Sequence, residues 1–284
     1  LTVSLHPKGA KIISIKGKKD QLNYMWRRDA SQWANSAPIL FPIVGALKND
    51  TCVINGKEYH MTQHGFARHN EFETNQVSDT EVIFSLKSND EIIKQYPFLF
   101  ELNVTYRLVE NKLTCHIKVK NTDHQPIYFQ VGGHPAFACP FMENESSNDY
   151  YLEFSENETC NRKIIDVEKR GMSRVEKPFF DNEKRFFVRQ ELFNTDAIVI
   201  KKFKSENIAL KSLNHDKSIV FHMNGFDHVG LWAAKHVGGL IAIEPWVGHA
   251  DYTDFNGEFK EKESCVELPV GKNFEVEFAV EINQ

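Results

Sequence analysis

The stretch "ELNVTYRLVENKLTCHIKVKN", residues 101–121, decides the fold. Apolar and polar residues alternate on both sides of Glu110 and Asn111, and a period of two is typical of a half-buried β-strand. The two arms therefore predict antiparallel strands joined by a turn. The stretch "TCVINGKEYHM", residues 51–61, repeats the pattern around an Asn-Gly pair, which is a strong hairpin signal.

The same period recurs along most of the chain. Helical patterns are short, one at 89–97 with Asn89 or Asp90 as its cap and one turn at "SQWANSAPI", residues 31–39. The polar segment 142–195 is expected to be a long insertion with a few strands of its own. Because strands and helices do not alternate, we expect an all-β fold, a large antiparallel β-sandwich or barrel with few short helices, in one domain over residues 1–284. Further strands are expected at 81–87, 127–131, 197–203, 208–213, 218–223, 229–235, 240–244 and 274–282.

The composition of the chain limits the kinds of partner that the protein is expected to bind. The net charge is −5 and the basic residues are scattered, so the chain has no basic stripe for nucleic acid or an anionic membrane. Five cysteines without CxxC spacing argue against a disulfide framework and a structural zinc site. No apolar run reaches 18 residues, and the first 17 residues alternate instead of forming the apolar core of a signal peptide. We expect a cytoplasmic monomer or homodimer that binds neither nucleic acid nor membrane.

The stretch "QVGGHPAFACP", residues 130–140, places a histidine between two glycines and a proline. Gly132 and Gly133 permit close approaches that side chains forbid, and Pro135 restricts the backbone of His134 before it. Such a rigid histidine suits contact with a ligand at a fixed angle. The alternative is a loop that ends a strand and contains a histidine by chance.

Three histidines lie close together in "EYHMTQHGFARHNEF", residues 58–72. His60, His64 and His69 are weak candidates for a metal site, because they contain no HxH pair. His60 and His64 would lie on the same face of a strand only if no turn came between them. We interpret "HGFAR" as a loop in which Gly65 makes a turn and leaves His64 and Arg68 free to bind a ligand. An ordinary polar surface loop is the alternative.

A third stretch that could contribute to a ligand-binding site is "IAIEPWVGHADYTDF", residues 241–255. Glu244 is expected to end an apolar strand, because Pro245 then interrupts the ladder. A carboxylate beside an aromatic ring, here Trp246, can form a sugar site, since the ring packs on apolar CH faces. The alternative is a solvent-exposed glutamate at the end of a strand. Trp232 is expected in the core instead of the wall of such a site.

Other chemistries lack their usual motifs. The chain has no GxSxG elbow, no GxxxxGK[ST] phosphate loop and no GxGxxG after a first strand. Paired-carboxylate glycosidase chemistry stays open, because two acids that are distant in sequence can meet in space. Asp251 and Asp254 are the nearest carboxylates to Glu244 in sequence.

Five motifs occur in a fixed order: "PILFPIVG" (38–45), "HGFAR" (64–68), "GGHPAF" (132–137), "FNTDAIVI" (193–200) and "IAIEPWVG" (241–248). In this combination the chain resembles the aldose 1-epimerase (galactose mutarotase-like) family, most closely its LacX-type branch, encoded with lactose-utilisation genes. Each motif is short, but their joint order covers nearly the whole chain. The resemblance implies a β-supersandwich and a cofactor-free enzyme, without a metal, that interconverts the α and β anomers of an aldohexose.

The resemblance also implies roles for individual residues. His134 would be the acid at the ring oxygen, and Glu244 the base at the anomeric hydroxyl. His64, Arg68 and Asp196 would bind sugar hydroxyls, and we expect Trp246 to pack against the sugar. Opening a pyranose requires one proton to leave O1 and another to reach O5, which such an acid–base pair supplies.

One difference between this chain and its relatives bears on the identity of the substrate. Relatives often carry an arginine after "FPIVG", where this chain has Ala46. An arginine there would donate to sugar hydroxyls or to a phosphate. A neutral sugar is therefore favoured over a hexose 6-phosphate, although Arg27, Arg28 and Lys48 could still reach the pocket. A sugar-binding or sensing module without turnover is the rival from another class.

Overall fold

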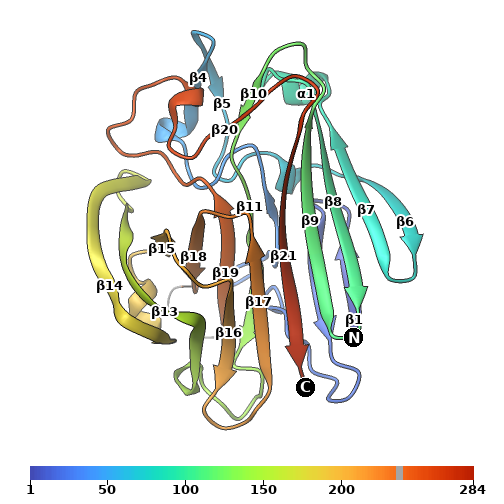
Figure 1. The fold of residues 1–284 in the computed structure, drawn as a ribbon, viewed down its shortest axis with the longest axis vertical. Helices are drawn as coiled ribbons and strands as arrows, with labels where there is room; N and C mark the ends of the chain where they lie inside the picture. Colours follow the sequence, from blue (N-terminus) through green and yellow to red (C-terminus); the bar gives the residue numbers. More distant parts are fainter. Residues whose placement is uncertain (235–238) are drawn as a thin grey trace.

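A computed structural model describes residues 1–234 and 239–284 of the chain. Strands run from end to end (Figure 1). Their bounds are β1 Thr2–His6, β2 Lys11–Lys16, β3 Ile39–Leu40, β4 Thr51–Ile54, β5 Lys57–His60, β6 Glu73–Ser78, β7 Glu81–Lys87, β8 Phe100–Val109, β9 Lys112–Asn121, β10 Ile127–Phe129, β11 Val131–Gly133, β12 Ala136–Cys139, β13 Tyr150–Asp166, β14 Gly171–Phe187, β15 Ile198–Lys201, β16 Asn207–Ser212, β17 Ser218–Asn224, β18 His228–Trp232, β19 Gly239–Val247, β20 Val266–Leu268 and β21 Asn273–Asn283.

Helices in the described part of the chain are few and short, as the sequence predicts. The helix α1 is capped by Asn89, whose side chain accepts hydrogen bonds from the backbone N–H groups of Glu91 and Ile92. None of the helices is long and apolar enough to cross a membrane. The helix bounds are α1 Asp90–Ile93 and the 3₁₀ turns η1 Lys48–Asp50, η2 Ala67–His69, η3 Ser147–Asp149, η4 Gln190–Phe193 and η5 Phe259–Glu261.

Both predicted hairpins form. Strands β4 and β5 pair around Asn55 and Gly56, whose φ angles of 53° and 75° are those of a tight two-residue hairpin turn. Strands β8 and β9 pair along their full length, and Glu110 takes the positive φ of 53° at the turn between them. Alternation along β8 and β9 places one face of each strand in the core.

Most strands join one 15-stranded antiparallel sheet. Its order is β3-β11-β19-β18-β15-β13-β16-β17-β21-β9-β8-β7-β6, with β12 also on β19 and β14 on β13. Three two-stranded sheets complete the described fold, namely β1-β2, β4-β5 and β10-β20.

The two halves of the large sheet pack face to face around the core. The ring of Phe137 on β12 lies 6.0 Å, centroid to centroid, from that of Phe221 on β17, although β12 and β17 are far apart in the strand order. The ring of Phe278 on β21 likewise lies against β11, since a Cβ atom on Gly133 would be 2.8 Å from it. Such contacts between non-neighbouring strands define a sandwich. The predicted antiparallel β-sandwich is therefore confirmed.

The polar segment 142–195 does contain strands of its own. Strands β13 and β14 form one long hairpin with several register shifts, and it curls along one side of the molecule (Figure 1). Because β13 also pairs with β15 and β16, the hairpin is part of the main sheet. Its tip, residues 165–172, lies over the site described below.

Strand β19 corrects one prediction. It continues through Pro245 to Val247, so Glu244 lies inside a strand and not at its end. On one side β12 pairs with residues 239–242 and β11 with Trp246 and Val247, and Pro245 falls between these two ladders. The missing proline N–H therefore costs no ladder hydrogen bond there. Of the strand predicted at 229–235, Lys235 lies outside the described residues.

Candidate functional site

A cavity of about 350 Å³ opens between β11, β19, the "HGFAR" turn and the tip of the β13–β14 hairpin. This volume is within the range of small-molecule sites, roughly 300–1,000 Å³. All the residues proposed from the sequence line it: His64, Arg68, His134, Asp196, Glu244 and Trp246.

Crowding explains the two glycines before His134. A Cβ atom on Gly132 would lie 2.8 Å from the carbonyl oxygen of Pro245, and one on Gly133 would lie 2.8 Å from the ring of Phe278. Neither distance is tolerable for a side chain. The His134 N–H donates to the carbonyl of Pro38 at 3.1 Å. The backbone that carries the imidazole is thus fixed between two strands and the core.

His134 and Glu244 meet at the base of the cavity. Nε2 of His134 lies 3.3 Å from Oε2 of Glu244, and both side chains are buried. His134 Nδ1 and Glu244 Oε2 have no hydrogen-bond partner among the described residues. A buried acid and a buried base without other partners are unusual, because buried polar groups are normally satisfied.

Burial controls the charge of this pair. It lowers the pKa of His134 to about 3, and the positive charge of Arg68 acts in the same direction. Burial, and next the negative charge of Asp196, raises the pKa of Glu244 well above its ordinary value. Both shifts favour the uncharged forms, as expected where water is excluded.

His64 is held by a strained turn. His64 and Gly65 have φ angles of 65° and 70°, and a Cβ on Gly65 would lie 2.3 Å from the carbonyl oxygen of Phe41. Only glycine fits at position 65. The Gly45 N–H donates to Nδ1 of His64 at 3.1 Å, while the His64 N–H donates to the Gly45 carbonyl. Since Nδ1 accepts, the neutral ring carries its proton on Nε2.

Trp246 and Asp196 both contribute to the wall of the cavity. Trp246 is buried against Gly132 and Gly230, where a Cβ would lie 2.8 and 2.6 Å from its ring. Asp196 adopts a φ of 79°, and its carboxylate accepts a hydrogen bond from the N–H of Ala197. The tryptophan offers a flat apolar surface and the aspartate offers hydrogen-bond acceptors.

Two further tryptophans complete an aromatic wall. The ring of Trp33 stacks on His134 with centroids 4.7 Å apart, and Trp232 meets His134 edge-on at 5.6 Å. Trp232 lines the cavity and is only partly buried, so its predicted place in the core is wrong. Trp33 was not predicted as a site residue. No helix forms at residues 31–39: Trp33 follows a turn at residues 30–32, and its backbone N–H donates to the carbonyl of Asp29. The local sequence gives no sign that this ring lies against His134.

The basic residues at the cavity differ in part from those expected. Arg68 lines it, and so does Arg170 at the hairpin tip, which donates two hydrogen bonds to the carboxylate of Asp50 at 2.9 and 3.1 Å. Ala46 also contributes to the lining, so an arginine at that position would face the ligand. Sequence spacing gave no sign of Arg170, because strand pairing over the long hairpin brings it there.

Several other candidates do not line the cavity. Arg27 lies near Asp29, and Lys48 donates to Asn256. Asp254 pairs with Arg174, and Asp251 pairs with Lys262. Asp251 and Asp254, the nearest carboxylates to Glu244 in sequence, are therefore not partners of Glu244, and Asp196 is the carboxylate that shares the cavity with it. The remaining residues outside the lining are Arg28, His60 and His69.

The fold and the pocket define a class of protein, an antiparallel β-sandwich with a small-molecule cavity that contains a buried acid–base pair. Comparison with known proteins makes the class specific. The family model described as aldose 1-epimerase matches residues 1–267. The chain therefore belongs to the aldose 1-epimerase family, as its motifs predict.

Individual relatives agree with this family. The chain is 36% identical to the plasmid-encoded protein LacX of Lactococcus lactis subsp. lactis over 262 residues, 87% of this chain and 85% of LacX. A galactose mutarotase related enzyme of Lactobacillus acidophilus superposes with a TM-score of 0.95 at 30% identity, covering 99% of this chain and 94% of that one. A galactose mutarotase-like protein of Lactobacillus casei gives a TM-score of 0.91 at 29% identity, covering 99% and 96%.

Proposed function

We propose that the protein is an aldose 1-epimerase, or mutarotase, that interconverts the α and β anomers of a free aldohexose. The observation that supports this most strongly is the contact between His134 and Glu244, 3.3 Å apart at the base of a cavity of sugar size. Membership of the aldose 1-epimerase family supports the same chemistry.

The proposed reaction consists of two coupled proton transfers. Glu244 takes the proton of the anomeric hydroxyl O1 while His134 gives a proton to the ring oxygen O5, and the bond between C1 and O5 breaks. The aldehyde rotates about C1–C2. Ring closure then reverses both transfers and delivers the other anomer. Because side chains carry both protons, the proposed reaction needs no cofactor.

The pair must hold one mobile proton for this reaction. A protonated Glu244 beside a neutral His134 contains as many protons as an ionised Glu244 beside a protonated His134. Burial favours the first arrangement in the free protein. Since the two groups touch, the proton can pass between them, and the second arrangement is the one that donates to O5 and accepts from O1.

The other cavity residues serve binding in this proposal. His64 presents its Nε2–H, Arg68 a guanidinium and Asp196 a carboxylate to the hydroxyl groups of the sugar. Trp246 would lie against apolar CH groups of the ring. The binding energy fixes C1 and O5 against the acid–base pair, which is how positioning lowers the barrier.

The test is anomer exchange, followed by NMR on equilibrated sugars. The panel contains glucose, galactose and their 6-phosphates, each with wild-type protein and with Glu244→Gln. Faster exchange of a neutral sugar with wild type, lost in the variant, supports the proposal. Faster exchange of the 6-phosphates alone would indicate a hexose-6-phosphate mutarotase. Signals that broaden on binding without exchange would instead indicate a sugar-binding or sensing protein.

A further inference from the structure

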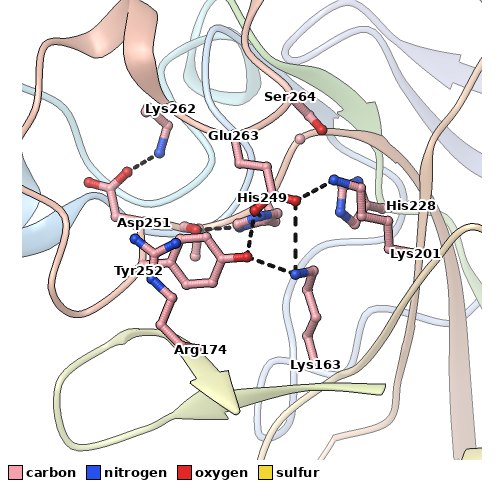
Figure 2. Close-up of polar contacts among 12 residues, drawn as sticks. Lys163, Arg174, Lys201, His228, His249, Asp251, Tyr252, Lys262, Glu263 and Ser264 are labelled. Atoms are coloured by element: carbon pink, nitrogen blue, oxygen red, sulfur yellow. Dashed lines mark hydrogen bonds and ion pairs between the residues drawn. The ribbon is translucent and has the colours of Figure 1, made fainter. Parts of the chain in front are cut away.

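A second polar cluster lies outside the sugar cavity. It contains His228, the first residue of β18, His249 after β19, and Glu263 before β20 (Figure 2). One ligand atom from each of these residues lies within 4.8 Å of the other two. None of the three lines the cavity of the proposed sugar site.

His228 is fully buried, and its tautomer is fixed by a neighbour. Its Nδ1 lies 2.7 Å from Oδ1 of Asp227, a carboxylate that can only accept, so Nδ1 carries the proton. Nε2 therefore presents a lone pair to the cluster. No group in the described part of the chain makes a hydrogen bond to this Nε2.

His249 is arranged in the same way. It is 2% exposed, and its Nδ1 lies 2.6 Å from the carbonyl oxygen of Ala250, which again can only accept a proton. Its Nε2 also lacks a hydrogen-bond partner among residues 1–234 and 239–284. Two buried imidazole lone pairs thus converge. In metal sites, a ligating histidine is commonly oriented by such an oxygen acceptor on its other nitrogen.

Glu263 supplies an oxygen to the same space. Its Oε1 accepts from Lys201 and lies 4.0 Å from Nζ of Lys163. Its Oε2 accepts from the hydroxyl of Tyr252 at 2.5 Å and lies 3.5 Å from Nε2 of His249. The lysines therefore occupy one carboxylate oxygen, and the other oxygen faces the histidines.

We propose that His228 Nε2, His249 Nε2 and Glu263 Oε2 bind a divalent transition metal ion, zinc by preference. Zinc bonds of about 2.0–2.1 Å in a tetrahedron place neighbouring ligand atoms about 3.3 Å apart. The 3.5 Å between His249 Nε2 and Glu263 Oε2 already fits this spacing. The ligand atom of His228 lies within 4.8 Å of the other two, so a movement of up to about 1.5 Å by these side chains completes a zinc tetrahedron.

The charges around the cluster select the kind of metal. Lys163 and Lys201 oppose a cation, while Glu263 and Asp227 favour it. Calcium and magnesium prefer shells of oxygen ligands, which this cluster does not provide. Two imidazole nitrogens and one carboxylate oxygen suit zinc or cobalt. Such an ion would join β18 and the segment after β19 to the segment that precedes β20.

The experiment is a titration of chelator-treated full-length protein with Co²⁺, followed by its visible absorption, and then displacement by Zn²⁺. We expect one equivalent to bind with the spectrum of a four-coordinate nitrogen and oxygen site. His228→Gln and His249→Gln should each weaken binding at least 100-fold. The matched control is His222→Gln, which removes a histidine that also contacts a carboxylate, Glu281 at 3.0 Å, and should leave binding unchanged.

A fourth variant covers the case in which the buried histidine variants fail to fold. Asp227→Asn keeps both ligating nitrogens but weakens the acceptor behind His228, and should reduce affinity about 10–100-fold. The absence of binding to folded wild type would overturn the proposal. So would binding that is equally strong in Asp227→Asn or that is lost in His222→Gln. Sugar exchange is not part of this readout, so its failure leaves the metal proposal unaffected.

Discussion

Glu244 and Glu263 are separated by 18 residues in the chain, but their surroundings are opposite. Glu263 lies 3.5 Å from Nε2 of His249 and accepts hydrogen bonds from Lys201 and from the hydroxyl of Tyr252. Glu244 is buried beside neutral His134, and burial raises its pKa. Donors stabilise the charge of the first carboxylate, whereas nothing comparable stabilises the charge of the second. An acid left unsatisfied is the one that is available to exchange a proton with a ligand.

The largest effect is expected on catalysis at the unsatisfied pair. Glu244→Gln and His134→Asn should each lower the rate of anomer exchange about 10²–10⁴-fold, because each removes one of two proton transfers with little change in volume. The measurement is NMR exchange of equilibrated sugar under saturating conditions. Full exchange in either variant, with thermal unfolding intact, would show that the residue has no proton-transfer role.

The same substitution should change stability in opposite directions at the two glutamates. Glu263→Gln should lower the free energy of unfolding by about 1–2 kcal/mol, the lower part of the range for hydrogen bonds to charged groups, because 32% of the side chain is exposed. Glu244→Gln should raise it at pH 7 by about 0.5–2 kcal/mol, as is common when a buried, unsatisfied active-site group is replaced. Urea unfolding of both variants in chelator gives the comparison.

The sign at Glu244 follows from proton linkage. Above pH 4.5 the unfolded chain releases the proton of Glu244, while the folded protein retains it until its raised pKa. Stability due to this group is therefore lost as pH rises through that interval. The gain in Glu244→Gln should grow above pH 4.5 and vanish below it. A loss of stability in this variant at pH 7 would mean that Glu244 is ionised and paired with protonated His134.

The pH dependence of exchange should show a broad plateau. The active pair holds one proton. On the acid side, kcat/KM falls when the pair takes up a second proton, on His134, at a pKa of about 3. On the alkaline side, it falls when the pair loses its proton above the raised pKa of Glu244. Rates measured from pH 3 to 10, corrected for exchange without protein, test this. A fall centred near pH 6.5 on the acid side would contradict a buried, neutral His134.

The smallest effect is expected at Trp33. Its ring stacks on His134 and helps to exclude water from the imidazole. Trp33→Leu should raise the pKa of His134 toward its ordinary value and move the acid limb of kcat/KM upward, with a change in the plateau of no more than about tenfold. A profile that keeps its acid limb in the variant would mean that other residues alone keep the imidazole dry.

The sequence was sufficient to predict the fold, and the six residues proposed from it line one cavity. Period-two alternation and the Asn55-Gly56 turn are local signals, and they predicted the hairpins that form. Five of the pocket residues lie in short motifs of glycine, proline and polar or aromatic residues that could be recognised one by one, whereas Asp196 was proposed only from the resemblance to the family. The continuation of β19 through Pro245 could not be predicted, because a proline is tolerated there only where that strand changes its partner from β12 to β11.

Residues that reach the two sites through contacts between distant segments of the chain could not be predicted from the sequence. Arg170 reaches the cavity because β13 and β14 pair across the whole polar segment, with shifts in register that no local pattern encodes. Trp33 and Trp232 come from distant segments, yet their rings lie 5.5 Å apart, centroid to centroid, and both contact His134. His228 and Glu263 carry no motif, and their approach to His249 depends on the packing of three separate segments.

The most direct measurement is anomer exchange of glucose and galactose by NMR, with wild type and Glu244→Gln compared at pH 7 and at equal concentration. Wild type is expected to accelerate exchange of at least one of these sugars, and the variant, folded and at least as stable, is expected not to. Equal acceleration by both proteins would contradict the role of the buried pair. Absence of acceleration by wild type with any sugar of the panel would contradict the proposed activity itself.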